Sequence, residues 1–150
     1  MRYVSVAYMV FLTLLCSVPV AHASDGDVIR QFGLLGRIAI DCSAPYSAKN
    51  PYLIYAVSAQ GKVTRTLKMG TDLDGTFAMR NFRMAGPGLL QYDETGRQSN
   101  LTVSVAKVGG KFRSWRSVRI SGPNKGAVLI ADGKFADGDN QTPAFEFCGN

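Results

Sequence analysis

The chain has 150 residues, a net charge of +6 and 46% hydrophobic residues, which suits one globular domain of ordinary size. Its single histidine, His22, lies close to the N-terminus. Histidine is the commonest general base near neutral pH and the commonest metal ligand. A mature chain without His22 therefore could not use Ser-His-Asp or Cys-His catalysis or a histidine-ligated zinc site.

Residues 1–23 have the pattern of a cleavable signal peptide. Arg2 gives a positive start, an apolar run extends over residues 4–20, and residues 21–23 (Ala-His-Ala) form a small-x-small cleavage site. An uncleaved anchor is the lesser alternative, because the run is shorter than the ~20 residues of a spanning helix. Cleavage predicts an exported protein, periplasmic or extracellular, made of residues 24–150 and without a transmembrane segment.

Two of the three cysteines, Cys42 and Cys148, remain after cleavage. The third, Cys16, could instead anchor a lipoprotein, but Leu15 is bulky where such signals have a small residue. Export predicts that Cys42 and Cys148 form a structural disulfide. The chain-entropy model gives roughly 4.7 kcal/mol of stabilisation for a closed loop of about 100 residues.

After the signal, only residues 27–35 predict a helix, about two turns long. Nine β-rich runs separated by turn residues follow, at 36–42, 52–58, 62–69, 76–84, 89–93, 99–108, 111–120, 127–132 and 144–148. The short links favour antiparallel neighbours. The pattern predicts an all-β protein, an antiparallel up-and-down barrel of about eight to nine strands with a short N-terminal helix. A β-sandwich is the alternative. The predicted disulfide favours the barrel, because it brings the first strand near the last.

Arginines share predicted strand faces with apolar residues. Alternation places Arg65 beside Val63 and Leu67, and Arg116 beside Phe112. A buried guanidinium needs a partner, and arginine suits carboxylates and phosphates. Asp132 is the best inward carboxylate, and an anionic ligand is the other possible partner. The alternative is that each arginine reaches water at a strand end. The candidate ligand-binding residues are therefore Arg65 and Arg116, with Tyr55 and Trp115 as walls.

Three further patterns are weaker indications of function. Residues 111–119 mix cations and aromatics as single-strand nucleic-acid binders do, but export argues against a nucleic-acid partner. Asp72-x-Asp74-Gly75 lacks the later ligands of a calcium loop, so neither a metal nor a cofactor is predicted. The carboxylates Asp93 and Glu94 are expected at a turn, without an apolar setting that would raise a pKa. No catalytic residues are predicted, and the protein is not expected to be an enzyme.

A short predicted helix precedes Gly36-Arg37-Ile38, which opens the first predicted strand, and a predicted disulfide comes late, after a strand meander. This layout over residues 27–148 resembles the lipocalin-like (calycin-type) barrel. The family signature is glycine-x-tryptophan, and Ile38 occupies the tryptophan place. The resemblance implies binding of small apolar ligands inside the barrel. Residues 41–52 also resemble a group of small exported bacterial proteins of unassigned function.

The sequence predicts one function and leaves one alternative. The first is an exported non-enzymatic binding protein that holds a small amphipathic anionic or lipidic ligand in the barrel. The alternative is a periplasmic protein-interaction module, such as an inhibitor of a cell-wall enzyme, acting on an envelope protein through residues 43–51 or 133–142. The chain is similar in size and export to periplasmic lysozyme-inhibitor barrels, although no stretch matches their inhibitory loop motif.

Overall fold

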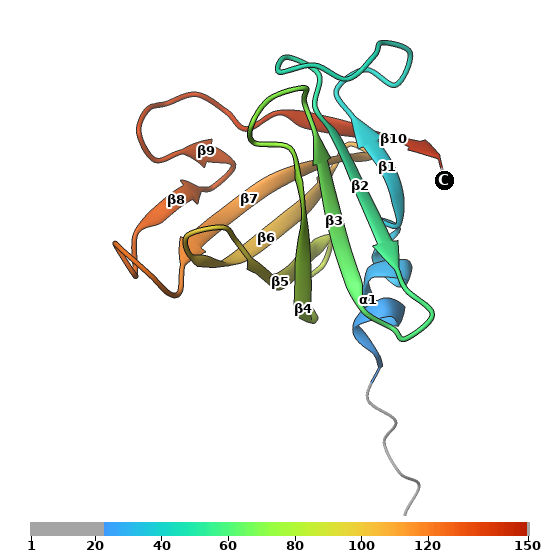
Figure 1. Ribbon diagram of the computed structural model, residues 1–150, viewed down its shortest axis with the longest axis horizontal. Coiled ribbons are helices and arrows are strands. Elements are labelled where there is room, and N and C mark those ends of the chain that lie inside the picture. The colour runs from blue at the N-terminus through green and yellow to red at the C-terminus, as the bar shows by residue number, and fades with distance from the viewer. Residues whose placement is uncertain (1–22, 150) are drawn as a thin grey trace, which may run out of the picture.

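Helix α1 (Asp25–Phe32) comes first in the computed structural model, which describes residues 23–149 (Figure 1). The predicted signal peptide, apart from Ala23, lies outside the described residues. Ser24 and Asp27 cap the helix reciprocally: each side chain accepts from the other residue's N–H, at 3.2 and 3.3 Å. Gly33, at φ +80°, ends it in the left-handed conformation. These caps set the helix about two residues earlier than the predicted 27–35.

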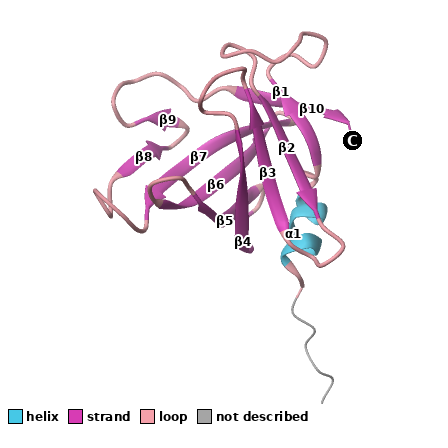
Figure 2. Ribbon diagram, viewed as in Figure 1, coloured by secondary structure: helices cyan, strands magenta, loops and turns pink. Residues whose placement is uncertain are grey.

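Ten strands follow α1 in the described part of the chain (Figure 2). They are β1 (Gly36–Ala39), β2 (Tyr52–Val57), β3 (Val63–Lys68), β4 (Gly75–Gly86), β5 (Leu89–Thr95), β6 (Asn100–Val108), β7 (Lys111–Arg119), β8 (Val128–Ala131), β9 (Lys134–Phe135) and β10 (Ala144–Gly149). Nine of them match the nine predicted runs. The tenth, β9, is only two residues long and lies in a segment interpreted as a loop.

The described strands form a closed antiparallel barrel of eight, β1 to β7 and β10, as predicted. Sequential neighbours pair from β1 to β7, and β10 closes the ring by pairing with β1 and with the start of β7. The β8–β9 hairpin pairs instead with the end of β7, where Ser117 lies opposite Ile130, and extends the wall beyond the closure. The sandwich alternative is therefore wrong.

The predicted disulfide lies at the closure of the barrel. Cys42 follows β1 and Cys148 lies in β10, with their Cα atoms 5.3 Å apart and their sulfur atoms at bonding distance. The strands that they join are already paired, since Ile38 lies opposite Phe147. The cross-link thus ties the first strand to the last where the barrel closes.

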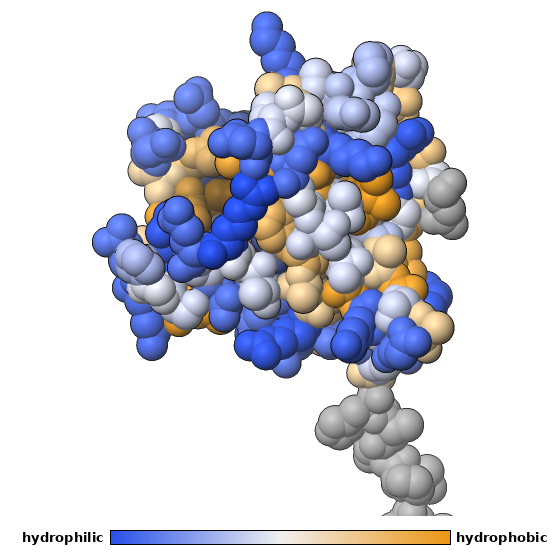
Figure 3. All heavy atoms as spheres, in the orientation of Figure 1, coloured by the Kyte–Doolittle hydropathy of each residue, from blue (hydrophilic) through white to orange (hydrophobic). Residues whose placement is uncertain are grey.

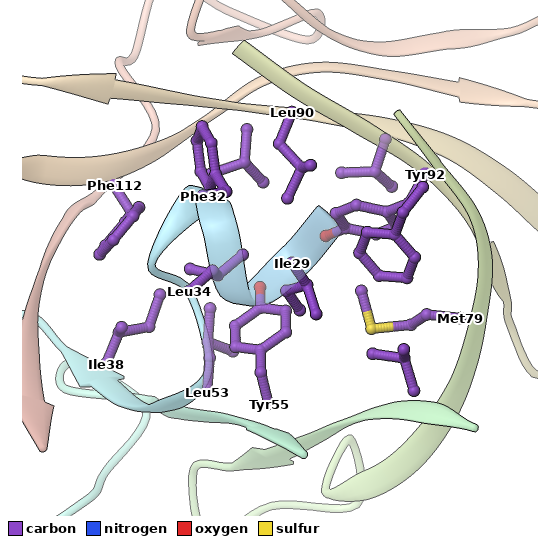
Figure 4. Close-up of a cluster of buried hydrophobic side chains, with 14 of the residues drawn as sticks. Ile29, Phe32, Leu34, Ile38, Leu53, Tyr55, Met79, Leu90, Tyr92 and Phe112 are labelled. Atoms are coloured by element: carbon purple, nitrogen blue, oxygen red, sulfur yellow. The ribbon is translucent and has the colours of Figure 1, made fainter. Parts of the chain in front are cut away.

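Helix α1 lies across one end of the barrel and fills it with apolar side chains (Figure 4). Ile29 of the helix and Leu34, which follows its C-cap, are fully buried, and the Phe32 ring lies 5.9 Å from that of Phe112. Each such side chain contributes about 1.5–3 kcal/mol on burial. The Asp25 carboxylate ties the helix to β4 by accepting the N–H groups of Asn81 and Phe82 at 3.1 and 2.8 Å. This end of the barrel is therefore part of the core.

A bulge in β7 changes which of its side chains face the lumen. Val105 of β6 lies opposite Ser114 and the preceding residue, Ser104, lies opposite Arg116, so Trp115 is the extra residue. Beyond the bulge Ser117 is buried, whereas Arg116 is exposed. The predicted sharing of one face by Arg116 and Phe112 is wrong, because a one-residue shift exchanges the two faces of a strand.

Candidate functional site

A cavity of about 260 Å³ lies in the barrel, lined by β2, β3, β5, β6, β7, β8 and β9 and by no residue of α1. Its apolar lining residues are Leu101 and Val103 of β6, Leu129 and Ile130 of β8 and Phe135 of β9. Its polar lining residues are Tyr55, Arg65, Tyr92 and Glu94 of β2, β3 and β5, together with Ser114 and Ser117 of β7, which lies between β6 and β8. Figure 3 shows an apolar hollow between hydrophilic residues, on the side of the molecule where Figure 1 places β8 and β9. The cavity is thus amphipathic and reaches the surface.

Two of the polar lining residues of this cavity form an ion pair. Arg65 Nη2 donates to Glu94 Oε1 at 2.7 Å, and their side chains are 19% and 5% exposed. Arg65 comes from β3 and Glu94 from β5, so the pair spans β4 on the inside of the barrel. The Arg65 guanidinium also lies 5.4 Å from the centre of the Phe77 ring. Glu94 is therefore the partner that a buried guanidinium requires.

The ionisation of this cluster follows from burial and from its charges. Burial acts to lower the pKa of Arg65, but the charge of the Glu94 carboxylate is the largest effect that opposes it, and the pKa is raised. Burial raises the pKa of Tyr55, and it raises that of Tyr92 well above its ordinary value. At neutral pH the guanidinium is charged and both phenols are protonated.

The ion pair leaves two buried polar atoms without partners, Arg65 Nε and Glu94 Oε2. Buried donors and acceptors are nearly always hydrogen-bonded in native proteins, to protein or to ordered water. Here one donor and one acceptor belong to two residues that line the same cavity. Both atoms are themselves buried, so other atoms of the two side chains face the cavity.

A second cavity, of about 490 Å³, adjoins the first at the loops between β3 and β4 and between β5 and β6. The two have Glu94, Leu101 and Leu129 in common as lining residues, so they are neighbours. Arg119, beyond the bulge in β7, lines this outer part. Its Nε is buried without a partner, its Nη1 donates to the Pro123 carbonyl at 3.4 Å, and no ion pair joins it to a carboxylate among residues 23–149. Arg119 is thus a cation at the mouth without an acidic partner.

The structure brings together two of the four predicted site residues. Tyr55 and Arg65 line the inner cavity. Arg116 is exposed on the outer face, and Trp115 borders a separate surface hollow with Gly133 and other residues. The bulge in β7 separates these two from the lumen.

Sequence reasoning missed Glu94 and Arg119. The sequence predicts Glu94 at a turn, but Glu94 continues the inward alternation of Leu90 and Tyr92 in β5. The two-residue period of the strand is the sequence signal that indicates its inward position. Asp132, the predicted inward carboxylate, is exposed. The inward position of Arg119 depends on the bulge, for which the sequence of β7 carries no signal that we recognise.

Hydrogen bonds between the Asp74 carboxylate and nearby backbone N–H groups hold the Asp72–Gly75 turn. The Asp74 carboxylate accepts the N–H groups of Met69, Gly70 and Thr71 at 2.7, 3.1 and 3.3 Å. The N–H of Met69, helped by the other two and by the charge of Arg97, lowers the Asp74 pKa. Within residues 23–149 no three His, Cys, Asp or Glu side chains lie together as metal ligands.

The described helix is too short and too polar to span a membrane.

Comparisons of the chain with protein-family models, with curated proteins and with solved structures gave no match.

Proposed function

We propose that this protein is an exported, non-enzymatic binding protein that holds a small amphipathic anionic ligand in the barrel. One observation carries the proposal: next to the apolar lining residues of the lumen, the outer cavity is lined by Arg119, which forms no ion pair with a carboxylate within residues 23–149. Pockets for small molecules are mostly apolar with a few placed polar groups. In this proposal Arg119 takes the anion, and Leu129, Ile130 and Phe135 contact the apolar body.

Two features support a binding role in the cell envelope or outside the cell. The Cys42–Cys148 disulfide suits an oxidising compartment, in agreement with the signal-peptide pattern of residues 1–23. Glu94, the buried carboxylate of the lumen, is already engaged by Arg65, which favours a fixed recognition group over a proton carrier. The eight-strand barrel with a helix at one end is compatible with the lipocalin-like layout, so we propose membership of that group as part of the same hypothesis.

The test uses a matched pair of variants on β7. Arg119→Gln removes the cation at the mouth, and Arg116→Gln removes an exposed cation three residues away with the same change in net charge. We expect decanoate to raise the melting temperature of the wild type and of Arg116→Gln, and to raise that of Arg119→Gln much less. A ligand at 100 times its Kd stabilises by about 2.7 kcal/mol.

Native mass spectrometry of the protein purified from its own host gives an independent readout. A co-purifying mass of a few hundred daltons would support the proposal. Absence of any bound mass, together with unchanged melting temperatures across saturated fatty acids of different length, would remove it.

The second candidate function is inhibition of a cell-wall enzyme through an exposed loop. The hydrogen bonds that hold the loop of residues 43–51 in one conformation favour it. Asn50 is buried and its amide donates to the carbonyls of Asp41, Ala44 and Pro45 at 2.9, 3.2 and 3.2 Å. The loop presents the Tyr46 ring, which is 48% exposed. Loss of envelope-protein capture in Tyr46→Ala, with lipid binding retained, would favour this candidate.

A further inference from the structure

The outer face of β7 carries most of the cations and the tryptophan of residues 111–119, and the proposed site in the lumen does not use them. Phe112 is buried in the core, so the next residue, Arg113, lies on the outside of the barrel. The bulge then leaves both Trp115 and Arg116 on the outside as well. Two cations and an aromatic ring therefore share one face of the strand.

A polar row crosses the outside of the sheet and ends at Arg116. Arg83 of β4 lies opposite Gln91 of β5, and Gln91 lies opposite Ser104 of β6. Ser104 in turn lies opposite Arg116 of β7. The Arg83 guanidinium donates to the side-chain oxygen of Gln91, and the Gln91 amide donates to Ser104 Oγ at 3.2 Å. Strands are ~4.8 Å apart, so the row separates the backbones of its two arginines by roughly 14 Å.

The arginines of this face have no acidic partner. No ion pair joins Arg83, Arg113 or Arg116 to a carboxylate in the described part of the chain, residues 23–149. Asp93, which follows Gln91 on the outer side of β5, accepts instead from two neutral side chains at 2.8 and 2.7 Å. The face is therefore cationic and complementary to a partner with several negative charges.

A surface hollow of about 260 Å³ adjoins this row where the sheet divides, since β10 pairs with the start of β7 and β8 with its end. The turn Asp132-Gly133 borders it, and the Gly133 N–H donates to the Trp115 carbonyl at 2.9 Å. The hollow is lined by Val108, Arg113, Trp115, Asp132, Gly133 and Gln141. Its guanidinium, carboxylate and amide can donate to hydroxyl groups and accept from them. An indole face attracts C–H groups through its negative quadrupole. This combination suits a sugar ring.

We propose that this face binds an acidic polysaccharide, a polymer of sugars that carry carboxylate groups. One sugar ring occupies the hollow against Trp115, and carboxylates further along the chain contact Arg116 and Arg83. The two arginines are too far apart for one small anion, and an extended chain can reach both. Export, as residues 1–23 predict, would bring the protein to such polymers. This surface lies outside the lumen, and the inference stands apart from the proposed function.

The experiment is isothermal titration calorimetry of the wild type with three oligomers of six sugars: hexagalacturonic acid, its full methyl ester and hexamannuronic acid. The methyl ester keeps the sugar chain and removes its charge. We expect at least one acid to bind about tenfold more tightly than the ester, and its affinity to fall as NaCl screens the exposed charges. The same acid should change the fluorescence of Trp115.

Three results would overturn the proposal. The first is that neither acid binds. The second is that the methyl ester binds as tightly as the acid. The third is that single-stranded decathymidylate binds more tightly than both acids, which would assign the surface to a nucleic acid.

A matched pair of variants assigns the binding to this face. Arg116→Gln and Arg30→Gln each remove one exposed cation, but Arg30 lies on α1, which covers one end of the barrel. Arg116→Gln should bind the acid about fivefold more weakly, the effect of one exposed charge pair, and Arg30→Gln should stay within about twofold of the wild type. Equal losses in the two variants would show that net charge alone attracts the polymer.

Trp115 provides a readout that does not change the charge. Trp115→Phe keeps an aromatic ring and should bind the acid within about twofold of the wild type, whereas Trp115→Leu should bind it about fivefold more weakly. Equal affinities of these two variants would contradict the placement of a sugar ring against Trp115. The exposed Arg116→Gln keeps the proposal testable if a substitution at Trp115 prevents folding.

Discussion

The guanidinium of Arg65 donates to the carboxylate of Glu94 at 2.7 Å inside the barrel, although the two residues are 29 positions apart in the chain. Two strands, β3 and β5, bring them together across β4. Burying two charges costs free energy that their attraction offsets only while both are present. The buried position of each charged side chain therefore depends on the presence of the other.

This dependence predicts a strongly non-additive pair of substitutions. Arg65→Met leaves the Glu94 carboxylate buried without its partner and should lower the free energy of unfolding by about 3–5 kcal/mol. The double variant Arg65→Met with Glu94→Leu should recover most of that loss, as measured by urea denaturation. The control is Lys111→Met, because Lys111 and Glu146 are 3.9 Å apart on the surface and about half exposed. Its effect should stay below about 1 kcal/mol. Equal losses for the single and double variants would show that the pair is not coupled.

The two buried tyrosines predict a loss of stability at alkaline pH. Burial raises the pKa of Tyr55 and, more strongly, that of Tyr92. In the unfolded chain these phenols ionise near pH ~10. Above that pH the unfolded state binds fewer protons than the folded state, so stability is complete below pH ~10 and falls as pH rises towards the folded pKa values.

The measurement is the urea midpoint as a function of pH, together with phenolate absorbance. Tyr92→Phe should flatten the alkaline decline in stability and remove the last part of the absorbance change. Tyr46→Phe, at an exposed ring, is the matched surface control. A decline that is as steep in Tyr92→Phe as in the wild type would argue against this origin.

Much of the fold could be predicted because its signals are local. Alternating apolar residues and glycine turns mark each strand; Gly109 and Gly110, for example, have φ of +58° and +78° in the hairpin between β6 and β7. The disulfide prediction then favoured a closed barrel over a sandwich, and the register of β10 with β1 and β7 confirms that choice.

The candidate site was predicted only in part, because it depends on register. Arg65 follows the simple alternation of β3, so its inward position could be read from the sequence. Arg116 and Arg119 could not be placed in this way, since Trp115 adds one residue to β7 and exchanges the faces beyond it. The pairing of Arg65 with Glu94 needs the order of three strands in space, which no local pattern contains.

The disulfide predicts a large loss of stability on reduction. Replacing Cys42 and Cys148 with serine should lower the free energy of unfolding by about 2–5 kcal/mol, mainly because the unfolded chain gains freedom. Strand pairing between β1 and β10 should persist, so far-UV circular dichroism at low temperature should stay close to that of the oxidised protein. The wild type under a strong reductant is the control and should match the double variant. A change below about 1 kcal/mol would contradict the proposed contribution.

Trp115 offers a direct test of the bulge, because it is the single tryptophan of the chain. It does not line the lumen; a Cβ built on Gly133 would lie 3.3 Å from its ring, which places the ring against the turn between β8 and β9. Its fluorescence should therefore change little when a ligand enters the barrel. Phe135 does line the inner cavity. In the variant Trp115→Phe with Phe135→Trp, the same ligand should shift the emission to shorter wavelength, because it removes water from the indole. The opposite result is a clear emission shift for Trp115 in the wild type and none for the tryptophan at position 135. That result would mean that Trp115 lines the binding site and that the bulge does not exchange the inward and outward faces of β7.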